Sequence, residues 1–291
     1  MLTVEAPTGL RYLDAVTGLL QQRRLANPDG EVWEAADLQW WWPRHRHDDP
    51  ADARVWHDGG APIAAVVFTR WRPDRMGCDV FAAADFQPAW TFVTQRCAQL
   101  EDVRIEMALP STDTAAQQVA QHAGFAPSQE CYAVSWLDPA ARQEPRRPLP
   151  PGYRIVARSD DGTRPHPMIG RNGRQVEDGL RQCSLYDPEL DLAVIAPDSS
   201  VAGYALFWPD LVTGVGLVEP MRVQDAHAGQ GLAAQLLDVG LRELTARGCT
   251  RLKVSVLPAN TAAVRVYTGA GFVRTGLDRT WLYEQARCPG T

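Results

Sequence analysis

Three features within residues 215–272 have the residue types and spacing to do chemistry together. Glu219 interrupts an apolar, strand-like stretch, Gly229-Gln230-Gly231 forms a turn, and Tyr267 follows a potential helix cap at Asn260. A carboxylate on an apolar strand is costly to bury unless it has a task, such as accepting a proton. A tyrosine hydroxyl can donate a proton, and glycines before a helix expose main-chain N–H groups to an anion. These three features are therefore the candidate site, and the glycine turn indicates an anion held by the main chain.

The glycine turn lies between an apolar segment and a helix with one apolar face. The segment contains Val215, Leu217, Val218, Met221 and Val223, and the helix presents Leu232, Leu236, Leu237, Leu241 and Leu244. Unpaired donors in the first helical turn and the positive end of the helix dipole favour an anion there. The helix is expected to end at Gly248, a left-handed cap. A Gly-x-Gly turn alone is more often a tight turn without a ligand, so the neighbouring segments must decide.

The segments after this helix make the phosphate-binding interpretation specific. Residues 251–257 are typical of a strand, Asn260 can cap a short helix that carries Tyr267, and Gly271-Phe272 follows. This order of strand, glycine turn, long helix, strand and capped short helix resembles the acetyl-CoA-binding core of the GNAT superfamily of N-acetyltransferases. The resemblance implies an α/β fold of α+β layered type, in which a mixed, mostly antiparallel sheet is flanked by helices.

The resemblance also implies an enzyme, an acetyl-CoA-dependent N-acetyltransferase. A primary amine of a small-molecule acceptor would attack the thioester carbonyl directly, and Tyr267 is the expected acid for the departing thiolate. Glu219 is either the base for the amine or a charge that anchors a cationic acceptor. The residues expected to bind acetyl-CoA are Met221, Arg222, Val223, Gly229, Gln230, Gly231, Leu232, Ala233, Asn260 and Arg265. Acetyl-CoA is a co-substrate here, and no metal is implied.

Length, charge and cysteine use agree with a two-domain enzyme. The 291 residues, 45% of them hydrophobic, exceed the usual size of one core, and the formal net charge of -6 argues against a nucleic-acid partner. No apolar run is long enough to cross a membrane, and the N-terminal residues lack a basic region followed by an apolar block. We therefore expect a cytoplasmic monomer or homodimer without a membrane partner. The six cysteines lie far apart, so neither a zinc site nor a disulfide framework is predicted.

Residues 1–137 are expected to form a domain of their own. The sequence predicts a strand at 2–5, a helix around 10–20, a hairpin about residues 58–60, a helix from Pro88 and a strand at 103–109. Eight of the ten tryptophans lie in this half. The run Trp40-Trp41-Trp42 cannot place three rings on one buried face, so at least one ring is expected to meet the other half or a substrate.

A repeat connects the two halves of the chain. Thr114-Ala115-Ala116, Val119 and Ala123-Gly124-Phe125 match Thr261-Ala262-Ala263, Val266 and Ala270-Gly271-Phe272 at one offset of 147 residues. A fixed offset indicates a duplicated domain. In the first copy, however, Ala120 stands in the place of Tyr267, Asp113 replaces Asn260, and no glycine lies between Asp79 and Leu100. We expect tandem GNAT-like domains, the first of which is degenerate and lacks the acetyl-CoA motif.

Residues 138–152 contain five prolines and are expected to form a semi-rigid linker. Residues 153–291 would then be the catalytic domain, with a first strand at 153–158, a helix over 176–185 and a hairpin about 198–200. The segment 162–174 is expected to be a loop, and in GNAT proteins the equivalent region usually lines the acceptor site. The run from His45 to Asp49 is expected to be a solvated turn, because its spacing fits no zinc pattern.

Two functions from different classes remain open from the sequence. The first is an N-acetyltransferase acting on a small amine, and mycothiol synthases, which are also tandem GNAT proteins, are one type within it on grounds of architecture. The second is a CoA-binding regulatory or scaffold protein in which the acceptor site is vestigial. Tyr267, Asn260 and Glu219 favour the enzyme. The residues name neither the acceptor nor the length of the acyl group.

Overall fold

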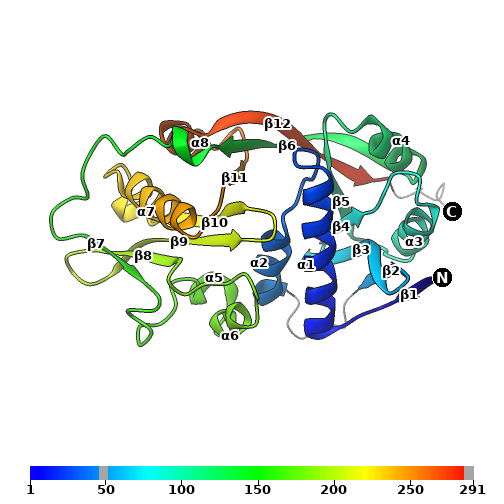
Figure 1. Cartoon of the computed structure of the whole chain (residues 1–291), viewed down its shortest axis with the longest axis horizontal. Helices are drawn as coiled ribbons and strands as arrows, with labels where there is room; N and C mark the ends of the chain where they lie inside the picture. The colour runs from blue at the N-terminus through cyan, green and yellow to red at the C-terminus, as the bar shows by residue number, and fades with distance from the viewer. Residues whose placement is uncertain (46–51, 285–291) are drawn as a thin grey trace. The chain divides into compact units, whose positions relative to one another are not determined.

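The structure is a computed structural model that describes residues 1–45 and 52–284. Most of the run from His45 to Asp49 therefore lies outside the described residues. The chain forms two compact units. Unit 1 comprises residues 1–38, 45–132 and 277 onward, and unit 2 comprises residues 39–44 and 133–276. Each unit contains a sheet with helices packed against it (Figure 1).

Unit 1 has the sheet order β1-β2-β3-β4-β5-β12. Its elements are β1 (Leu2–Glu5), α1 (Gly9–Ala26), β2 (Ala53–Asp58), β3 (Ala61–Arg72), β4 (Arg75–Phe81), α3 (Gln87–Ala98), β5 (Arg104–Pro110), α4 (Thr114–His122), the first part of β6 (Phe125–Leu137) and the last part of β12 (Val273–Tyr283). All neighbouring strands pair antiparallel except β4 and β5, which are parallel.

Unit 2 has the order β6-β11-β10-β9-β8-β7. Its elements are most of α2 (Ala35–His45), the end of β6, the short helix η1 (Pro139–Ala141), β7 (Arg154–Ala157), α5 (Ile169–Asn172), α6 (Val176–Arg181), β8 (Asp191–Ile195), β9 (Val201–Asp210), β10 (Val215–Val223), the short helix η2 (Asp225–His227), α7 (Leu232–Ala246), β11 (Arg251–Val256) and α8 (Thr261–Gly269). Only β10 and β11 pair in parallel. The expected fold class, a mixed and mostly antiparallel sheet flanked by helices, is confirmed.

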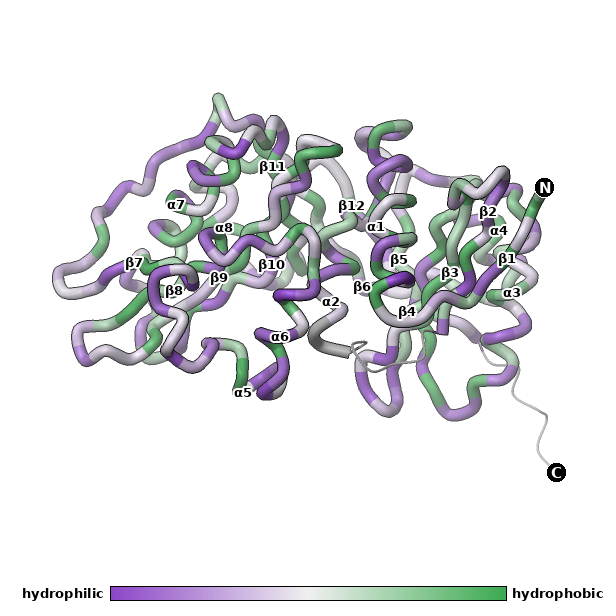
Figure 2. The backbone as a smooth tube through the Cα atoms, turned by 60° about the horizontal axis from the view of Figure 1, so that its bottom comes forward, coloured by the Kyte–Doolittle hydropathy of each residue, from purple (hydrophilic) through white to green (hydrophobic). Residues whose placement is uncertain are grey.

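Helix α7 shows why the sequence folds locally as it does. Its leucines recur at helical spacing and are buried in the core of unit 2, whereas hydrophilic residues occupy its other faces (Figure 2). Gly240 allows the helix to approach the sheet, because a Cβ there would lie 2.1 Å from the ring of Phe207 on β9. The helix ends where expected, with Gly248 in the left-handed region at a φ of +100°.

The repeat is reproduced in the structure at the offset read from the sequence. Helices α4 and α8 begin and end at residues 147 apart, and both are capped by the residue before them. Asp113 Oδ1 accepts from Ala116 N at 2.9 Å, and Asn260 Oδ1 accepts from Ala263 N at 3.1 Å. The two halves are therefore copies of one architecture.

The last strand of each repeat completes the sheet of the other unit. The end of β6, which follows α4, pairs antiparallel with β11 in unit 2. The end of β12, which follows α8, pairs antiparallel with β5 in unit 1. The units consequently do not correspond to a single cut in the chain near residues 138–152.

Two local expectations differ from the structure. The segment 162–174 contains the short helix α5, which ends where Gly173 adopts a φ of +87°. Helix α6 stops at Arg181, short of Leu185. One reason is that the main-chain N–H of Leu185 donates to Gln39 Oε1 at 2.8 Å and not to a carbonyl one turn earlier.

The expectation that at least one ring of the tryptophan run of α2 meets the other half of the chain is confirmed. Trp40, Trp41 and Trp42 are all buried, with 2%, 4% and 2% of their surface exposed, and residues 39–44 group with unit 2. Successive helical residues point about 100° apart, so α2 is covered on several sides and not on one face. Trp42 Nε1 donates to Gln182 Oε1 at 2.9 Å within unit 2.

Candidate active site

The two central strands of unit 2 part from each other. Parallel pairing joins Val215–Leu217 of β10 to Arg251–Lys253 of β11 and ends there. On its other side, β10 stays paired with β9 as far as Val223. No strand of the described residues pairs with the free edge of β10 beyond Leu217, so its main-chain groups can bind a ligand. Met221, Arg222 and Val223, the expected pantetheine-binding residues, lie in this part of β10.

A β-bulge places Glu219 at the point where the strands part. The register of β10 against β9 shifts between Val218 and Met221, which leaves Glu219 outside the regular ladder. Trp208 of β9 holds the bulge by donating from Nε1 to the main-chain oxygen of Glu219 at 2.6 Å. Bulges re-aim side chains, and this one positions a half-buried carboxylate beside the split.

Tyr267 on α8 shares the electrostatic environment of Glu219. Its ring lies edge-on to Phe272, with 5.9 Å between the ring centres. Burial and, secondarily, the negative charge of Glu219 raise the pKa of Tyr267 to about 12. The hydroxyl therefore keeps its proton at neutral pH, which suits a group that must donate a proton to a thiolate.

The glycine turn forms an open cradle at the start of α7. Gly229 and Gly231 adopt φ values of +77° and +81°, and a Cβ on either residue would meet no atom within 4 Å. Helix α7 has no side-chain cap at its N-terminus and no acidic residue in its first turn. Open space beside main-chain donors fits the diphosphate of acetyl-CoA.

A pocket of about 470 Å³ adjoins this cradle. All its lining residues belong to unit 2. They are Gln143, Glu144, Pro145, Arg146, Arg147, Gly229, Gly231, Ala234, Asp238, Arg265, Val266, Gly269 and Ala270. The pocket is thus bounded by the linker, the N-terminal half of α7 and the C-terminal half of α8. Its volume suits a ligand of drug size.

A hydrogen bond braces the segment that leads into the glycine turn. Tyr153, immediately before β7, lies with its hydroxyl 2.9 Å from Nδ1 of His227 in η2. The two rings also meet edge-on, with 5.8 Å between their centres. Tyr153 therefore positions the chain immediately before Gly229.

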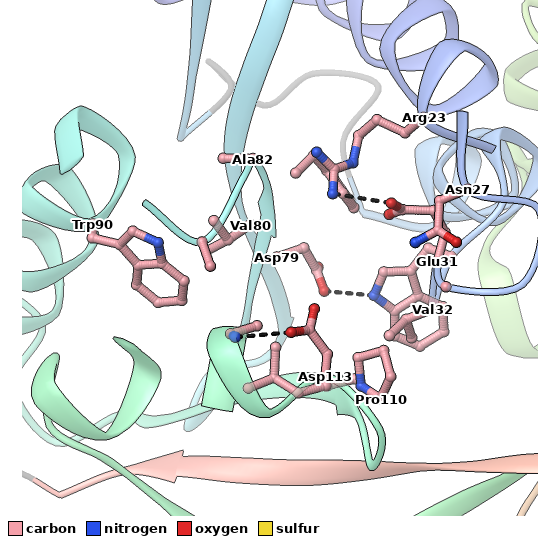
Figure 3. A pocket seen from close by; sticks show the side chains of 17 residues that line it. Arg23, Asn27, Glu31, Val32, Asp79, Val80, Ala82, Trp90, Pro110 and Asp113 are labelled. Atoms are coloured by element: carbon pink, nitrogen blue, oxygen red, sulfur yellow. Dashed lines mark hydrogen bonds and ion pairs between the residues drawn. The ribbon is translucent and has the colours of Figure 1, made fainter. Parts of the chain in front are cut away.

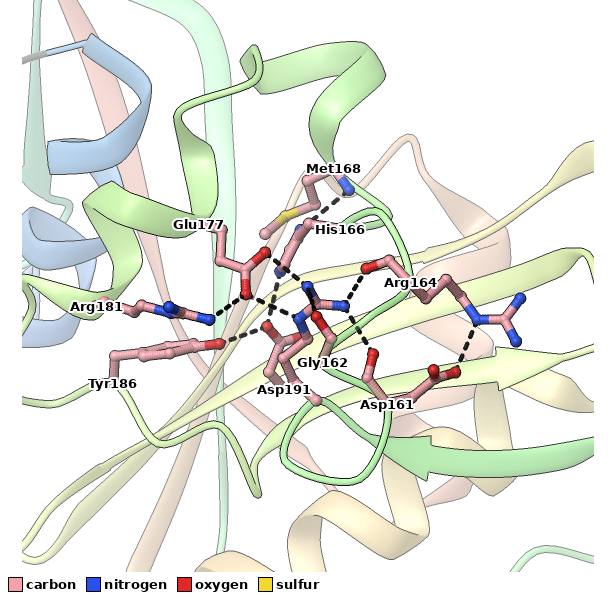
Figure 4. A network of polar contacts seen from close by, with 10 residues as sticks. Asp161, Gly162, Arg164, His166, Met168, Glu177, Arg181, Tyr186 and Asp191 are labelled. Atoms are coloured by element: carbon pink, nitrogen blue, oxygen red, sulfur yellow. Dashed lines mark hydrogen bonds and ion pairs between the residues drawn. The ribbon is translucent and has the colours of Figure 1, made fainter.

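A buried polar network ties the segment between β7 and β8 to the sheet (Figure 4). His166 Nε2 donates to Asp191 Oδ2 at 2.8 Å, while its Nδ1 accepts from Met168 N at 3.2 Å, which fixes a neutral tautomer. The hydroxyl of Tyr186 donates to the same Asp191 oxygen at 2.8 Å. Burial, followed by the charge of Asp191, raises the pKa of Tyr186. These groups form their hydrogen bonds with one another, so we interpret the network as a structural support.

Arg158 anchors the neighbouring part of that segment. It makes two bonds to the carboxylate of Glu177, at 3.1 and 2.6 Å, and its other nitrogens donate to carbonyls of the loop that follows β7. Burial opposes ionisation of Glu177, but the hydrogen bonds and charge of Arg158 outweigh it and hold the pKa of Glu177 below its ordinary value. The segment that the GNAT resemblance assigns to the acceptor side is therefore rigidly held.

Unit 1 contains a smaller pocket at the corresponding split (Figure 3). Its volume is about 100 Å³, and it lies where β4 and β5 part after Gly77 and Glu106. Trp33 closes on it and donates from Nε1 to Asp79 Oδ1 at 2.8 Å. Ala120, at the position equivalent to Tyr267, is fully buried in the core of unit 1. The segment that leads into α3 contains no glycine, so it has no counterpart of the cradle before α7.

The structure brings some of the predicted residues together and leaves others apart. Gly229, Gly231 and Arg265 line the pocket, and Glu219 interacts electrostatically with Tyr267. Two other candidates contribute little side chain to the site. Leu232 is buried in the core, so only its main chain is available to a ligand, and Asn260 uses its side-chain oxygen to cap α8. Gln230 and Ala233 flank the cradle in sequence.

Sequence reasoning missed the linker, Trp208 and Tyr153 as parts of the site. The prolines of the linker predict a spacer, and nothing in its pattern indicates that it forms the wall of a pocket. Trp208 resembles any apolar strand residue in the sequence. The one signal available in the sequence was an indole on the predicted strand that precedes the strand carrying Glu219.

Residues 1–45 and 52–284 contain no group of three or more His, Cys, Asp or Glu side chains arranged to hold a metal ion. Within the same ranges, no helix combines the length and apolarity needed to span a bilayer.

Comparison with a family model decides the identity of the second half. The model described as the acetyltransferase (GNAT) family matches residues 128–272. These residues form a GNAT acetyltransferase domain. The match covers the split strands, the cradle and Tyr267 together. It also begins within β6, the strand that completes the sheet of unit 2.

Solved GNAT structures share the fold of the whole chain. A tandem GNAT protein from the clavulanic acid biosynthesis pathway aligns with a TM-score of 0.68 and 15% identity, over 97% of this chain and 98% of that one. A GCN5-related N-acetyltransferase from Sphaerobacter thermophilus aligns with a TM-score of 0.57 and 18% identity, over 97% and 95%. At these identities the likeness shows the fold alone.

Curated relatives are similar to part of the chain. The mycothiol acetyltransferase of Geodermatophilus obscurus is 31% identical over 156 residues, which cover 47% of this chain and 50% of that protein. The mycothiol acetyltransferase of Kineococcus radiotolerans is 38% identical over 94 residues, or 32% and 29%. The chain therefore matches half or less of the length of these relatives.

Proposed function

We propose that this protein is an acetyl-CoA-dependent N-acetyltransferase that acts on a primary amine of a small molecule. One observation carries the proposal: the bulge of β10 places Glu219 where β10 and β11 part, and the charge of Glu219 acts on the hydroxyl of Tyr267. A scaffold that only held CoA would need the cradle but no half-buried proton donor that interacts with an acidic group.

The proposal gives each part of the site a role. The cradle at Gly229 and Gly231 and the first turn of α7 bind the diphosphate, and the free edge of β10 orients the pantetheine arm and the thioester. The amine nitrogen attacks the carbonyl carbon, so a C–N bond forms and the C–S bond breaks. Glu219 accepts the proton that the amine loses, directly or through water. Tyr267 gives its proton to the thiolate of CoA.

Similarity to mycothiol acetyltransferases favours one acceptor over other amines. We infer that the first acceptor to test is the amine that becomes mycothiol on acetylation. The rigid segment between β7 and β8, held by Arg158 and Asp191, supports a site selective for one acceptor shape.

The experiment is an assay of CoA thiol release by the full chain. Acetyl-CoA would be offered with that amine and with a panel of small primary amines, and Tyr267→Phe would serve as the inactive control. We expect acetylation of at least one amine at a rate that depends on Tyr267. Acetyl-CoA binding without thiol release from any amine would instead support a CoA-binding regulatory or scaffold protein.

A further inference from the structure

The glycine cradle brings no cation of its own. The segment from Gln224 to Gly231 contains Asp225 but neither Arg nor Lys. His227 lies within this segment, and its Nδ1 already contacts the hydroxyl of Tyr153. A CoA molecule carries a diphosphate and a separate 3′-phosphate, which is a monoester with nearly two negative charges at neutral pH. Positive charge for these groups must come from outside the cradle.

Three arginines line the pocket beside the cradle. Arg265 comes from α8, and Arg146 and Arg147 come from the linker. The two carboxylates of the lining, Glu144 and Asp238, both lie next to Arg142. No carboxylate in the described part of the chain lies at ion-pair distance from the three lining arginines. The pocket therefore has excess positive charge.

The linker is fixed in place by contacts that leave these arginine side chains free to bind. Gln143 N donates to Ala270 O at 2.9 Å, and Gln235 Nε2 donates to Arg147 O at 2.6 Å. Arg142 forms an ion pair with Asp238 of α7. In Figure 1 the linker (green) runs from beside α8 to β7. Because its main chain is held on both sides of Arg146, a bound anion would not have to order the segment, which favours tight binding.

We propose that Arg146 and Arg147 of the linker bind the 3′-phosphate of CoA. This inference rests on the proposed function, since it assigns a further part of the same ligand. The cradle takes the diphosphate at Gly229 and Gly231, so the adenosine end of the molecule extends into the adjoining pocket. The monoester there meets guanidinium groups, whose planar donors match phosphate oxygens. The linker then contributes to binding and makes the affinity depend on the presence of the 3′-phosphate.

The test compares two ligands in four proteins. Calorimetry would measure the dissociation constants of CoA and of 3′-dephospho-CoA for the wild-type chain. It would do the same for Arg146→Gln with Arg147→Gln, for Arg265→Gln, and for Arg171→Gln with Arg174→Gln. The last pair removes the same charge from exposed positions of unit 2 that do not line the pocket. It therefore controls for the general field of the protein.

We expect the wild-type chain to prefer CoA over 3′-dephospho-CoA by about ten-fold or more, the scale of one charge-assisted hydrogen bond. The linker variant should lose most of this preference and bind 3′-dephospho-CoA as the wild type does. The Arg171 and Arg174 control should keep the preference. Thermal unfolding of each variant checks that the fold is retained.

The outcomes separate this inference from the proposed function. An undiminished preference for CoA in the linker variant overturns the linker assignment while leaving the acetyltransferase proposal intact. Equal weakening of both ligands assigns the arginines to the diphosphate and also overturns the 3′-phosphate assignment. If the wild-type chain binds neither ligand, both proposals fail.

Discussion

The indole nitrogen of Trp208 donates a hydrogen bond to the main-chain oxygen of Glu219, at 2.6 Å. Trp208 itself is 1% exposed and belongs to β9, so a rigid strand supports the bulge that carries the acidic residue. The position of Glu219 is therefore set from the core of the sheet.

Replacing Trp208 should separate the position of the bulge from the stability of the fold. Trp208→Phe keeps a large ring but loses the donor, so we expect kcat to fall by roughly ten-fold and the free energy of unfolding to fall by about 1–3 kcal/mol. Steady-state kinetics and denaturant unfolding measure the two effects. The matched control is Trp281→Phe in unit 1, because Trp281 Nε1 is buried without a hydrogen-bond partner. Equal kinetic losses in both variants would rule out a specific role for Trp208.

Tyr267→Phe tests the proton donor. We expect kcat to fall by roughly ten- to a thousand-fold while acetyl-CoA binding stays nearly intact, since the ring still packs against Phe272 and only the hydroxyl is lost. Steady-state assays of thiol release give kcat, and calorimetry gives the affinity for acetyl-CoA. Unchanged turnover in the Phe variant would remove Tyr267 from the mechanism.

The raised pKa of Tyr267 sets the alkaline side of the pH profile. The proton-donating form is the neutral phenol, which persists below its pKa and is lost as the pH rises through about 12. We therefore expect no loss of kcat from this group between roughly pH 7 and pH 10, where an ordinary tyrosine begins to ionise. The measurement is the pH dependence of kcat, supported by ultraviolet titration of tyrosinate. A loss centred near pH 10 that disappears in Tyr267→Phe would contradict the assignment.

Gly231→Val tests the cradle. The added side chain enters space that is open in the protein, so steric disruption of the core is not expected, and the positive φ costs about 1–2 kcal/mol. CoA affinity should fall at least ten-fold, because the side chain would occupy the diphosphate position. Gly248→Val is the control: it has a φ of +100°, open space, and a place at the opposite end of α7. Wild-type affinity for CoA in a folded Gly231→Val sample would contradict the assignment of the diphosphate to the cradle.

The stoichiometry of acetyl-CoA tests the division of labour between the two copies. We expect one molecule per chain, because unit 1 has a pocket of only about 100 Å³ at its split and no glycine turn before α3. Calorimetric titration of the full chain gives the number of sites, and Gly231→Val should abolish the single site. Two equivalent sites would show that unit 1 binds acetyl-CoA through contacts of another kind.

The elements around the cradle were predictable from sequence because local rules agree there. Helix α7 follows a 3.6-residue apolar period and ends at a left-handed glycine, and α8 begins at an asparagine cap. The repeat offset of 147 residues then transferred this interpretation to α4. Local period and capping chemistry were sufficient because neither depends on distant partners.

The remaining features depend on contacts distant in sequence. Gln39 ends α6 early by accepting from Leu185, which follows it by 146 positions. The pocket wall formed by Arg146 and Arg147 exists because Gln235 and Ala270 hold the linker, and neither contact leaves a mark in the linker's own pattern. Pairing of β12 with β5 likewise depends on register between segments at opposite ends of the chain.

Because the last strand of each repeat completes the sheet of the other unit, the two units can complete their sheets only in a fixed order during synthesis. Every segment of unit 2 has been synthesised once residue 276 has left the ribosome, whereas unit 1 still lacks the part of β12 that pairs with β5. The first half of the chain to emerge is therefore the last to complete its sheet, and until then it presents β5 as an unpaired edge. A nascent chain stalled before residue 277 should expose that edge to chaperones and proteases while already containing every residue assigned to the acetyltransferase site.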